Sequence, residues 1–423
     1  MTNSMKQSHL FTKTKKEAPT DEVSKNAELL IRGGFIHKEM AGIYSYLPLG
    51  LRVLKKIENI IREEVNTVGG QEVSMTTLQN PELWEKTNRW SDEAVDCWFK
   101  TKLKNDAELG LGFSHEEPLV NILTNFISSY KDLPISIYQF QTKFRNELRV
   151  KSGLLRGREF FMKDMYSFHT DPKDFNNFYE KMKNVYKNIF QRVGIGHITY
   201  LTFASGGIFS KYSHEFQTIT PAGEDTIYIN EQNGIAVNKE VLNDEVLKNL
   251  GLEKDKLVER RAIEVGNIFE LKDKFSKPLD LSFKDLKGQK HDVLMGCYGI
   301  GLGRLMGAVV EALADERGII WPETIAPFSL HLLSLGEGSA LLQEADKVYK
   351  NLSKNGLEVL FDDRLEVSAG EKFADSDLLG IPWRAVVSER SLKEGGVEIK
   401  KRTEEKGKIV SVNKLLKLLA PRV

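Results

Sequence analysis

The alternation of apolar and polar segments near the C-terminal end of the chain predicts a compact α/β domain. Five segments of suitable length follow Pro327, with strands predicted at 329–335, 357–361 and 383–387 and helices at 339–354 and 372–379. Strands that alternate with helices are typical of a sheet covered by helices. We therefore expect a separate C-terminal domain over residues 327–423.

A second apolar segment, at 292–298, predicts a strand that runs into a glycine-rich stretch. Gly299, Gly301 and Gly303 are followed by Arg304, and a helix is predicted from 302 to 314. Glycine lets the backbone approach a ligand closely, and a helix N-terminus favours anions. The spacing differs from the dinucleotide fingerprint G-x-G-x-x-G, and the chain contains no G-x-x-x-x-G-K-[ST]. Neither a Rossmann cofactor site nor a phosphate-binding P-loop is therefore indicated.

The segment Phe144-Arg145-Asn146-Glu147 follows a predicted strand at 137–145. If the strand continues, Arg145 and Glu147 share a face, because strand side chains alternate. The guanidinium suits a phosphate or carboxylate, and the carboxylate can accept from an exocyclic amine. The alternative is an ion pair on a surface strand, worth about 0 to 1 kcal/mol.

In the N-terminal part of the chain, the pattern predicts helical structure from Thr20 to Glu64, with a break at Gly33-Gly34 and a turn around residues 48–50. Further strands are predicted at 72–75, 111–114 and 292–295. Together with the strand at 137–145 they would form a mostly antiparallel sheet.

Composition narrows the class of protein. The chain has 423 residues, 41% of them hydrophobic, enough for two or three domains. Lys+Arg and Asp+Glu are equal at 60 each, which argues against a protein that coats nucleic acid. Cys97 and Cys297 are far apart and the eight histidines lack ligand spacing, so we expect no disulfide and no zinc. No apolar run approaches the roughly 20 residues that span a bilayer, so we expect a cytoplasmic protein without membrane contact.

Together these segments resemble the three motifs of class II aminoacyl-tRNA synthetases, and in detail the bacterial-type prolyl-tRNA synthetases. Arg156, Phe160 and Asp164 follow the Phe144–Glu147 segment as in motif 2, and residues 292–304 resemble motif 3. The further matches lie in the family's order, at 42–52 (motif 1), 138–145, 158–169, 213–217, 295–301 and 315–322. The resemblance runs from about His9 to the C-terminus.

The resemblance implies an α+β fold. Residues 1–326 would form the class II catalytic domain, an antiparallel sheet flanked by helices, and residues 327–423 the α/β anticodon-binding domain. Where many bacterial members carry an editing domain, this chain has only a short stretch at about 231–261. We therefore expect no hydrolysis of alanyl-tRNA(Pro) within the chain. Binding alone separates proline from alanine by about 1 to 3 kcal/mol, so a separate trans-editing factor is expected. The motif 1 helix implies a homodimer, although such a helix can also be buried within one subunit.

The activity implied is ATP-dependent ligation of L-proline to tRNA(Pro) through prolyl-adenylate, with magnesium accompanying ATP and Glu215 as its candidate ligand. The alternative is a synthetase-like paralogue that adenylates an amino acid for a non-tRNA acceptor, against which the C-terminal domain argues. The resemblance assigns catalysis to Arg145, Glu147 and Arg304. It assigns ATP binding to Arg145, Glu147, Arg156, Phe160, Gln217, Gly301, Gly303 and Arg304.

Proline needs an anionic acceptor for its ammonium, a cation for its carboxylate and an apolar wall. Ser114-His115-Glu116 stands where the family usually has Thr-x-Glu, so Glu116 would take the ammonium. Glu116 also stands before a predicted helix, where a carboxylate is favoured in any case. A second departure is Phe209-Ser-Lys-Tyr in place of Gly-Gly-Ser. The proline-binding set is Ser114, Glu116, Arg145, Phe168, His169, His214 and Cys297.

The resemblance places anticodon contacts at Asp362, Asp363, Arg364 and Phe373. The three charged residues follow a predicted strand, where loop side chains can contact base edges. The alternative for them is an ion pair with a helix cap.

Overall fold

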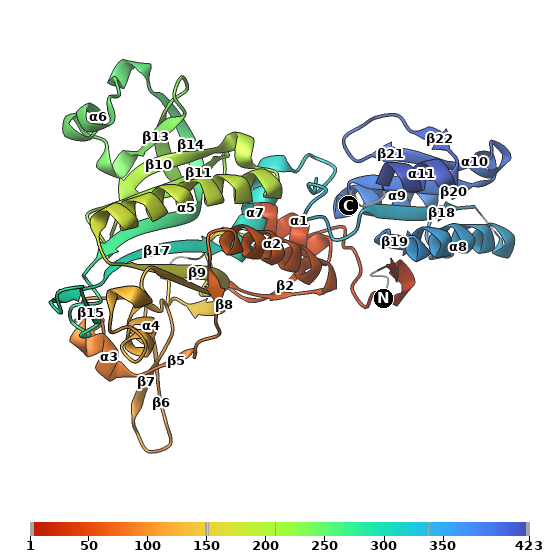
Figure 1. Cartoon of the computed structure of the whole chain (residues 1–423). Helices are drawn as coiled ribbons and strands as arrows, with labels where there is room; N and C mark the ends of the chain where they lie inside the picture. Colours follow the sequence, from red (N-terminus) through yellow and green to blue (C-terminus); the bar gives the residue numbers. More distant parts are fainter. Residues whose placement is uncertain (1–3, 149, 151, 208, 337, 420–423) are drawn as a thin grey trace. The chain divides into compact units, whose positions relative to one another are not determined.

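The computed structural model describes residues 4–148, 150, 152–207, 209–336 and 338–419. The chain divides into two compact units. One unit consists of Met40–Tyr44 and Ile57–Ala308, and the other of Met1–Glu39, Ser45–Lys56 and Val309–Val423. Figure 1 shows the elements of both units, coloured along the sequence from red at the N-terminus to blue at the C-terminus.

The first unit is built on a nine-stranded sheet with the order β11-β10-β13-β12-β14-β17-β9-β8-β4. Its pairs are antiparallel except for β10–β13 and β4–β8, which confirms the predicted mostly antiparallel sheet. The strands are β4 (Gln71–Glu72), β8 (Ile135–Phe144), β9 (Glu159–His169), β10 (Thr199–Ser205), β11 (Tyr212–Ile219), β12 (Asp225–Asn230), β13 (Ile235–Asn238), β14 (Val258–Lys272) and β17 (Leu294–Gly301).

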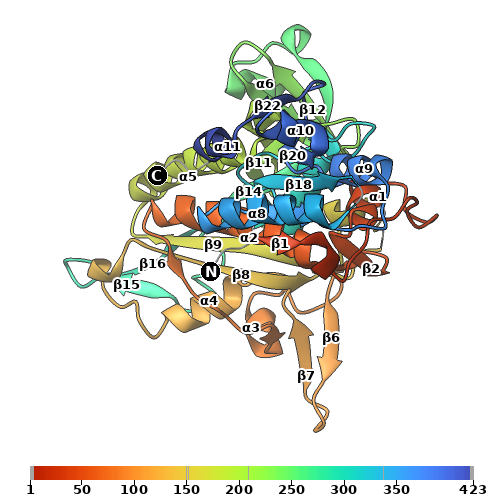
Figure 2. The same cartoon turned by 90° about the vertical axis from the view of Figure 1, so that its right-hand side faces the viewer.

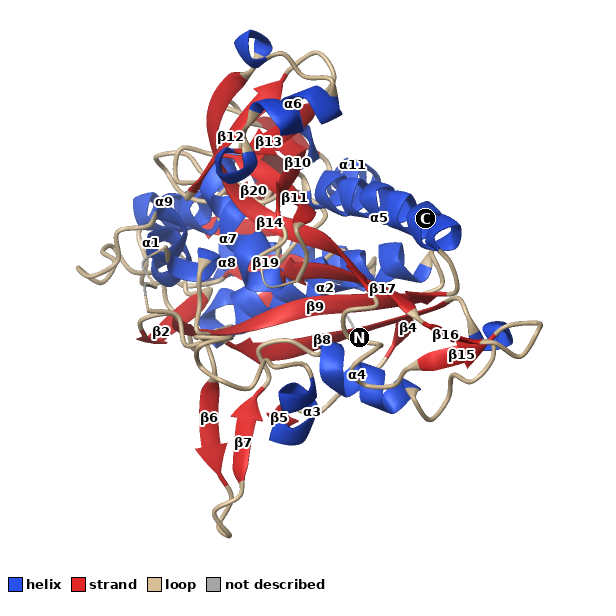
Figure 3. Cartoon of the chain, turned by 90° about the vertical axis from the view of Figure 1, so that its left-hand side faces the viewer, coloured by secondary structure: helices blue, strands red, loops and turns tan. Residues whose placement is uncertain are grey.

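Helix α5 (Pro172–Val193) packs on one face of this sheet, against β9 and β17 (Figure 3). Asp171 caps its first turn by accepting from the backbone N–H groups of Lys173 and Asp174. Gly194, with φ of +96°, ends it in the left-handed conformation that glycine adopts without strain. The helix buries an apolar stripe against the sheet: Phe175, Tyr179, Met182, Val185, Tyr186, Ile189, Phe190 and Val193.

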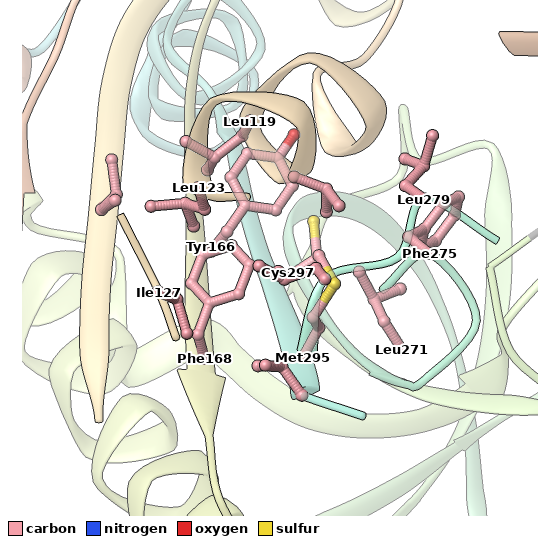
Figure 4. Close-up of a cluster of buried hydrophobic side chains, with 14 of the residues drawn as sticks. Leu119, Leu123, Ile127, Tyr166, Phe168, Leu271, Phe275, Leu279, Met295 and Cys297 are labelled. Carbon is pink, nitrogen blue, oxygen red and sulfur yellow. The ribbon is translucent and has the colours of Figure 1, made fainter. Parts of the chain in front are cut away.

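A hydrophobic cluster covers part of the opposite face. It joins α4 (Glu116–Leu123) to the sheet through Leu119, Tyr166, Phe168, Met295 and Cys297 (Figure 4). Tyr166 and Phe168 share this face because they are two residues apart on β9. The cluster adjoins the Ser114–Glu116 segment, because the Cys297 thiol lies 3.8 Å from the Glu116 carboxylate.

Smaller elements complete the first unit. A three-stranded sheet, β5 (Leu78–Gln79), β7 (Glu108–Leu111) and β6 (Phe99–Lys102), ends in a projecting hairpin (Figure 2). Helix α3 (Pro81–Lys86) precedes that hairpin, and β15 (Ser282–Lys284) pairs with β16 (Lys290–Asp292). The short stretch at 231–261 contains β13, α6 (Asp244–Leu250) and the entry to β14.

The second unit contains a six-stranded sheet with the order β1-β19-β18-β20-β21-β22. Its elements include β18 (Leu330–Leu335), α8 (Ser339–Lys354), β19 (Val359–Asp362), α9 (Ala369–Leu379), β20 (Trp383–Ser388), α10 (Glu389–Lys393), β21 (Val397–Lys401), β22 (Lys408–Val410) and α11 (Val412–Leu419). The predicted alternation of strands and helices after Pro327 is confirmed. The N-terminal β1 (Met5–Lys6) adds a parallel edge strand beside β19, which the sequence did not indicate.

The predicted break at Gly33-Gly34 is confirmed, since helix α1 (Lys25–Arg32) ends there, but the prediction of helix between this break and the turn at residues 48–50 is wrong. Helix α1 and helix α2 (Pro48–Asn66) are separated by a hairpin of β2 (Ile36–Met40) and β3 (Ile43–Tyr46). Gly42, with φ of +76°, forms its turn, so the glycines mark a change of element. The predicted strands at 72–75 and 111–114 are also displaced, to β4 and to β7 of the small sheet.

The strand and helix predicted around the glycine-rich stretch are confirmed as β17 and α7 (Leu302–Leu313). No helix within the described ranges has the length and apolar character needed to cross a membrane.

Candidate active site

A hollow that is open to solvent, with an empty volume of about 610 Å³, lies in the first unit. It is bordered by β9, β14, β17, the start of α7 and the loop after β8. The predicted ATP residues that line it are Arg145, Glu147, Arg156, Phe160, Gly301 and Arg304. Gln217 and Gly303 are not among the described residues that line it.

Arg145 and Glu147 reach this hollow by a different route from the one predicted. Strand β8 ends at Phe144, so neither residue lies on a strand. The N–H of Arg145 donates to the carbonyl of Arg158 (2.8 Å), and the N–H of Glu147 donates back to the carbonyl of Arg145 (2.8 Å). This tight turn, rather than strand alternation, brings the two side chains to one site.

An aromatic ring and a cation face each other beside the turn. The guanidinium carbon of Arg145 lies 5.3 Å from the ring centroid of Phe160, on β9. Its Nη2 also donates to the carbonyl of Phe113 at 3.5 Å, next to Ser114. Arg145 therefore borders both the hollow and the Ser114–Glu116 turn.

Two further arginines hold positive charge at the hollow. The Nε of Arg156 donates to Glu147 (3.2 Å), and its side chain is 45% exposed. The Nη1 of Arg304 donates to Glu264 (2.7 Å), and its Nε donates to the carbonyl of Leu155 (2.9 Å). Ion pairs at such exposed positions are weak, so an incoming phosphate can replace the carboxylates.

Carboxylates gather beside Arg304 around Gln217, which donates to Glu215 (2.9 Å) and to Asp225 (2.7 Å). Burial and the nearby Glu264 carboxylate raise the pKa of Glu215 to about 8, and burial also raises the pKa of Asp225. Such a group of acids favours a cation. Within the described ranges, no group of three or more His, Cys, Asp or Glu could hold a metal ion. The donors fit a magnesium ion that takes most of its ligands from phosphates and water.

The Ser114–Glu116 turn is closed. Glu116 is fully buried and accepts from the Ser114 hydroxyl (2.5 Å) and from Arg89 (3.3 Å). The Cys297 thiol, on β17, lies 3.8 Å from the same carboxylate. Arg89 also pairs with Glu117 (2.9 Å). Burial raises the pKa of Glu117 to about 7, against the opposing effect of Arg89.

The structure brings only some of the predicted proline residues to this turn. Phe168 and Cys297 belong to the hydrophobic cluster beneath it (Figure 4). His169 and His214 lie on the α5 face of the sheet instead. His169 contacts Asp174 (2.6 Å), and His214 contacts the Tyr179 hydroxyl (3.0 Å). Successive strand residues point to opposite faces, so Phe168 and His169 cannot both face proline.

Sequence reasoning missed three residues of these sites. Glu264 and Asn267 on β14 line the hollow, and Asn267 donates to Glu264 at 2.7 Å. A polar pair within the otherwise apolar segment 262–269 was the available signal. Arg89 lies near four aromatic rings, those of Trp84, Phe113, Phe209 and Phe275, at 4.9 to 5.2 Å. No pattern in the sequence marks it.

In the second unit, Asp362 is fully buried at the end of β19 and accepts from Arg364 at 2.7 Å. Arg364 also donates to Asp375 of α9 (2.8 Å). The Asp363 carboxylate accepts from the N–H and hydroxyl of Ser8 (3.0 and 2.8 Å). Phe373 lies under the guanidinium of Arg384, at 4.5 Å. The ion pair considered for this segment is present, but Ser368 caps α9.

Two family models match the chain. Residues 99–313 match the tRNA synthetase class II core domain (G, H, P, S and T), and residues 329–422 match the anticodon binding domain. Two solved structures share the fold: prolyl-tRNA synthetase from Giardia lamblia in complex with prolyl-adenylate, and that from Cryptosporidium parvum complexed with halofuginone and AMPPNP. Their TM-scores are 0.76 and 0.77, at 19% and 16% identity. The comparisons cover 92% and 93% of this chain, and 74% and 76% of theirs. At this identity the likeness concerns the fold alone.

Similarity to curated relatives extends along nearly the whole chain. The proline–tRNA ligase of Hyphomonas neptunium is 38% identical over 94% of this chain and 95% of its own length. The proline–tRNA ligase of Dehalococcoides mccartyi is 32% identical over 97% of this chain and 98% of its own length, in an alignment of 559 positions. The second relative therefore carries extra residues that this chain lacks, as expected for a form without the editing insertion. The chain belongs to the proline–tRNA ligase family of class II aminoacyl-tRNA synthetases.

Proposed function

We propose that the chain ligates L-proline to tRNA(Pro) in two steps, through prolyl-adenylate. The position of Arg145 carries this proposal beyond family membership. Its guanidinium borders the open hollow and also donates to the carbonyl beside Ser114, so one cation adjoins both substrate sites. A residue placed in this way can hold the proline carboxylate against the α-phosphate of ATP.

In the first step, a proline carboxylate oxygen attacks the α-phosphorus of ATP, and the bond to the β-phosphate breaks to release pyrophosphate. Phe160 stacks on adenine, and Glu147 accepts from its exocyclic amine. Arg145 neutralises the charge at the α-phosphate, while Arg156 and Arg304 hold the outer phosphates. Glu116 holds the secondary ammonium of proline, with Ser114 and Cys297 beside it.

Glu215 and Glu264 are the residues that would hold magnesium together with ATP, and the ion supplies charge neutralisation at the phosphates. Gln217 donates to both Glu215 and Asp225 and thereby positions those two carboxylates.

In the second step, a terminal ribose hydroxyl of tRNA attacks the activated carbonyl and AMP leaves. The open side of the hollow, at Glu147 and Arg156, admits the tRNA end. We assign residues 1–326 to catalysis and 327–423 to the anticodon, with Asp363, Arg364 and Phe373 as contacts. Asp362 then serves mainly to hold Arg364, because both groups are paired.

The chain works in the cytoplasm as a homodimer, and alanyl-tRNA(Pro) is cleared by a separate factor. Support for the last point comes from the small size of the 231–261 segment, which holds little more than β13 and α6.

The test is ATP–pyrophosphate exchange with proline, alanine, cysteine and threonine, followed by charging of tRNA(Pro). Exchange strongest with proline, together with charging, supports the proposal, and measurable alanine exchange with stable alanyl-tRNA supports the absence of editing. Exchange with none of the four amino acids would refute the proposal. Proline exchange without charging would favour adenylation for a non-tRNA acceptor.

A further inference from the structure

A buried lysine lies directly behind the Ser114–Glu116 turn. Lys143, on β8, is fully buried. Its ammonium lies 2.9 Å from the Asp164 carboxylate and 2.6 Å from Nδ1 of His115. Lys143 does not line the open hollow, and none of the substrate contacts proposed above involves it. A buried ammonium is costly unless it is paired and hydrogen-bonded, so its place here calls for a role.

The contacts of Lys143 determine the state of His115. An ammonium can only donate, so Nδ1 of His115 must accept. Its Nε2 lies 3.0 Å from the carbonyl of Thr76, which can only accept. The amide nitrogen of Gln79 lies farther from Nε2, at 3.4 Å, and donates to the same Thr76 carbonyl at 2.8 Å, so Nε2 carries the proton. His115 is therefore neutral, in the Nε2–H form. Burial and the nearby Lys143 charge lower the pKa of His115 to about 4, in agreement with this assignment.

His115 is held from its backbone as well. Its N–H donates to the Tyr166 hydroxyl (3.2 Å), and that hydroxyl donates to Asp164 (3.1 Å). Gln139 donates to the same carboxylate at 3.0 Å. Asp164 thus joins the lysine that holds the ring of His115 to the tyrosine that holds its backbone. Since His115 separates Ser114 from Glu116, this network determines where both side chains point.

We propose that Lys143 is a positioning residue for the amino acid substrate. By donating to neutral His115 it holds the Ser114–Glu116 turn in the geometry that receives the substrate's ammonium, without touching the substrate itself. This inference rests on the proposed function, because Glu116 is assigned to the ammonium there.

The chain offers a matched control. Lys163, on β9, is fully buried as well, and burial lowers its pKa to about 7. It points to the α5 face, where its ammonium donates to the Tyr186 hydroxyl (2.8 Å) and the Tyr298 carbonyl (2.9 Å). The two lysines are equal in type and burial, and they lie on opposite faces of the sheet.

The test compares Lys143→Met with Lys163→Met in proline-dependent ATP–pyrophosphate exchange by the whole chain. For Lys143→Met we expect the KM for proline to rise about 10- to 100-fold, with the KM for ATP within about twofold of wild type. Lys163→Met is expected to leave the KM for proline within about twofold. Equal effects of the two changes on the KM for proline, or no effect of Lys143→Met, would overturn the inference. A wild-type protein that shows no exchange would instead refute the proposed function.

A second measurement uses the wild-type protein and does not depend on folding of the variants. Nitrogen-15 NMR of labelled histidines, with His115 assigned by His115→Gln, should show a neutral Nε2–H ring down to about pH 5. A ring protonated on Nδ1, or one that titrates near 6.5, would show that Lys143 does not hold His115 and would overturn the inference. In a folded Lys143→Met, we expect His115 to titrate closer to its ordinary pKa.

Discussion

The hollow bounded by β9, β14 and β17 presents its charged groups to solvent, whereas the Ser114–Glu116 turn keeps its charged groups inside the protein. Arg156 is 45% exposed and Arg304 31%. Arg89, Glu116 and Glu117 are 6% exposed or less. Both places hold arginine–carboxylate pairs, and they differ in access to water.

This difference has consequences for energy and for ligand binding. Exposed pairs are screened and worth little, so they can open for a phosphate at small cost. If a buried pair loses one partner, the other is left as an unpaired charge in the low-dielectric interior of the protein. We therefore expect substitutions at the closed turn to have large effects that salt hardly changes, and those at the hollow to have smaller, salt-dependent effects.

The largest effect is expected from Arg89→Met. Removal of the cation leaves Glu116 and Glu117 buried side by side, at a cost of about 3 to 5 kcal/mol in unfolding free energy near neutral pH. Burial raises the pKa of Glu117, and without Arg89 nothing of comparable strength opposes this, so the variant's folded state binds an extra proton and its stability falls as pH rises. Thermal unfolding at pH 5 and pH 8 should show that the variant's loss of stability relative to wild type is larger at pH 8. A deficit that is equal at both values would show that the carboxylates are not its source.

Glu116→Gln keeps the size of the side chain and leaves the Arg89–Glu117 pair intact. We expect proline-dependent exchange to fall by about 100-fold or more, because the substrate ammonium loses its buried acceptor. The exposed Glu85→Gln on α3 serves as the control and should retain wild-type exchange. Activity above about one tenth of wild type would mean that another group receives the ammonium.

Arg304→Gln should raise the KM for ATP by about tenfold, because the outer phosphates lose one partly exposed cation. Salt at about 0.5 M should reduce the factor by which Arg304→Gln raises the KM for ATP. The factor by which Glu116→Gln lowers proline-dependent exchange should stay the same. Arg260→Gln, at an exposed position of β14, is the control. If the KM for proline changes instead, Arg304 does not act on ATP.

The smallest effect concerns Glu215, whose pKa is raised to about 8 by burial and by Glu264. A raised carboxyl pKa means that the folded state keeps a proton that the unfolded chain has lost. Stability therefore falls as pH rises from about 4.5 to 8. Glu215→Gln removes this penalty, so the free protein should melt about 2 °C higher than wild type at pH 8 and equally at pH 4.5. A gain at both pH values would point to a cause other than ionisation.

Several features could be predicted from local pattern because they depend on neighbours in the chain. The alternating segments after Pro327 are strands and helices as expected, and α7 begins where the glycine-rich stretch indicated. The Phe144–Glu147 segment and Arg304 were expected to meet, and both line one hollow. Resemblance supplied this last pairing, since nothing local connects residues so far apart.

Other features escaped prediction because distant backbone contacts decide them. The turn at Arg145–Glu147 depends on the carbonyl of Arg158, and the edge strand β1 depends on β19. The same holds for the face on which a side chain lies. His169 and Phe168 are neighbours in sequence, yet one packs against α5 and the other in the cluster beneath Glu116.

The sequence by itself determined the family and the order of the elements in the C-terminal domain, and it supplied the residues proposed for both substrate sites, because these follow from motifs and periodicity. Only the tertiary structure decided which of those residues are exposed to solvent and which are buried. It also revealed Lys143 behind His115 and Arg89 beside Glu116. Burial and pairing depend on strands that meet across long stretches of sequence, and no local pattern records which charged side chains will be enclosed together.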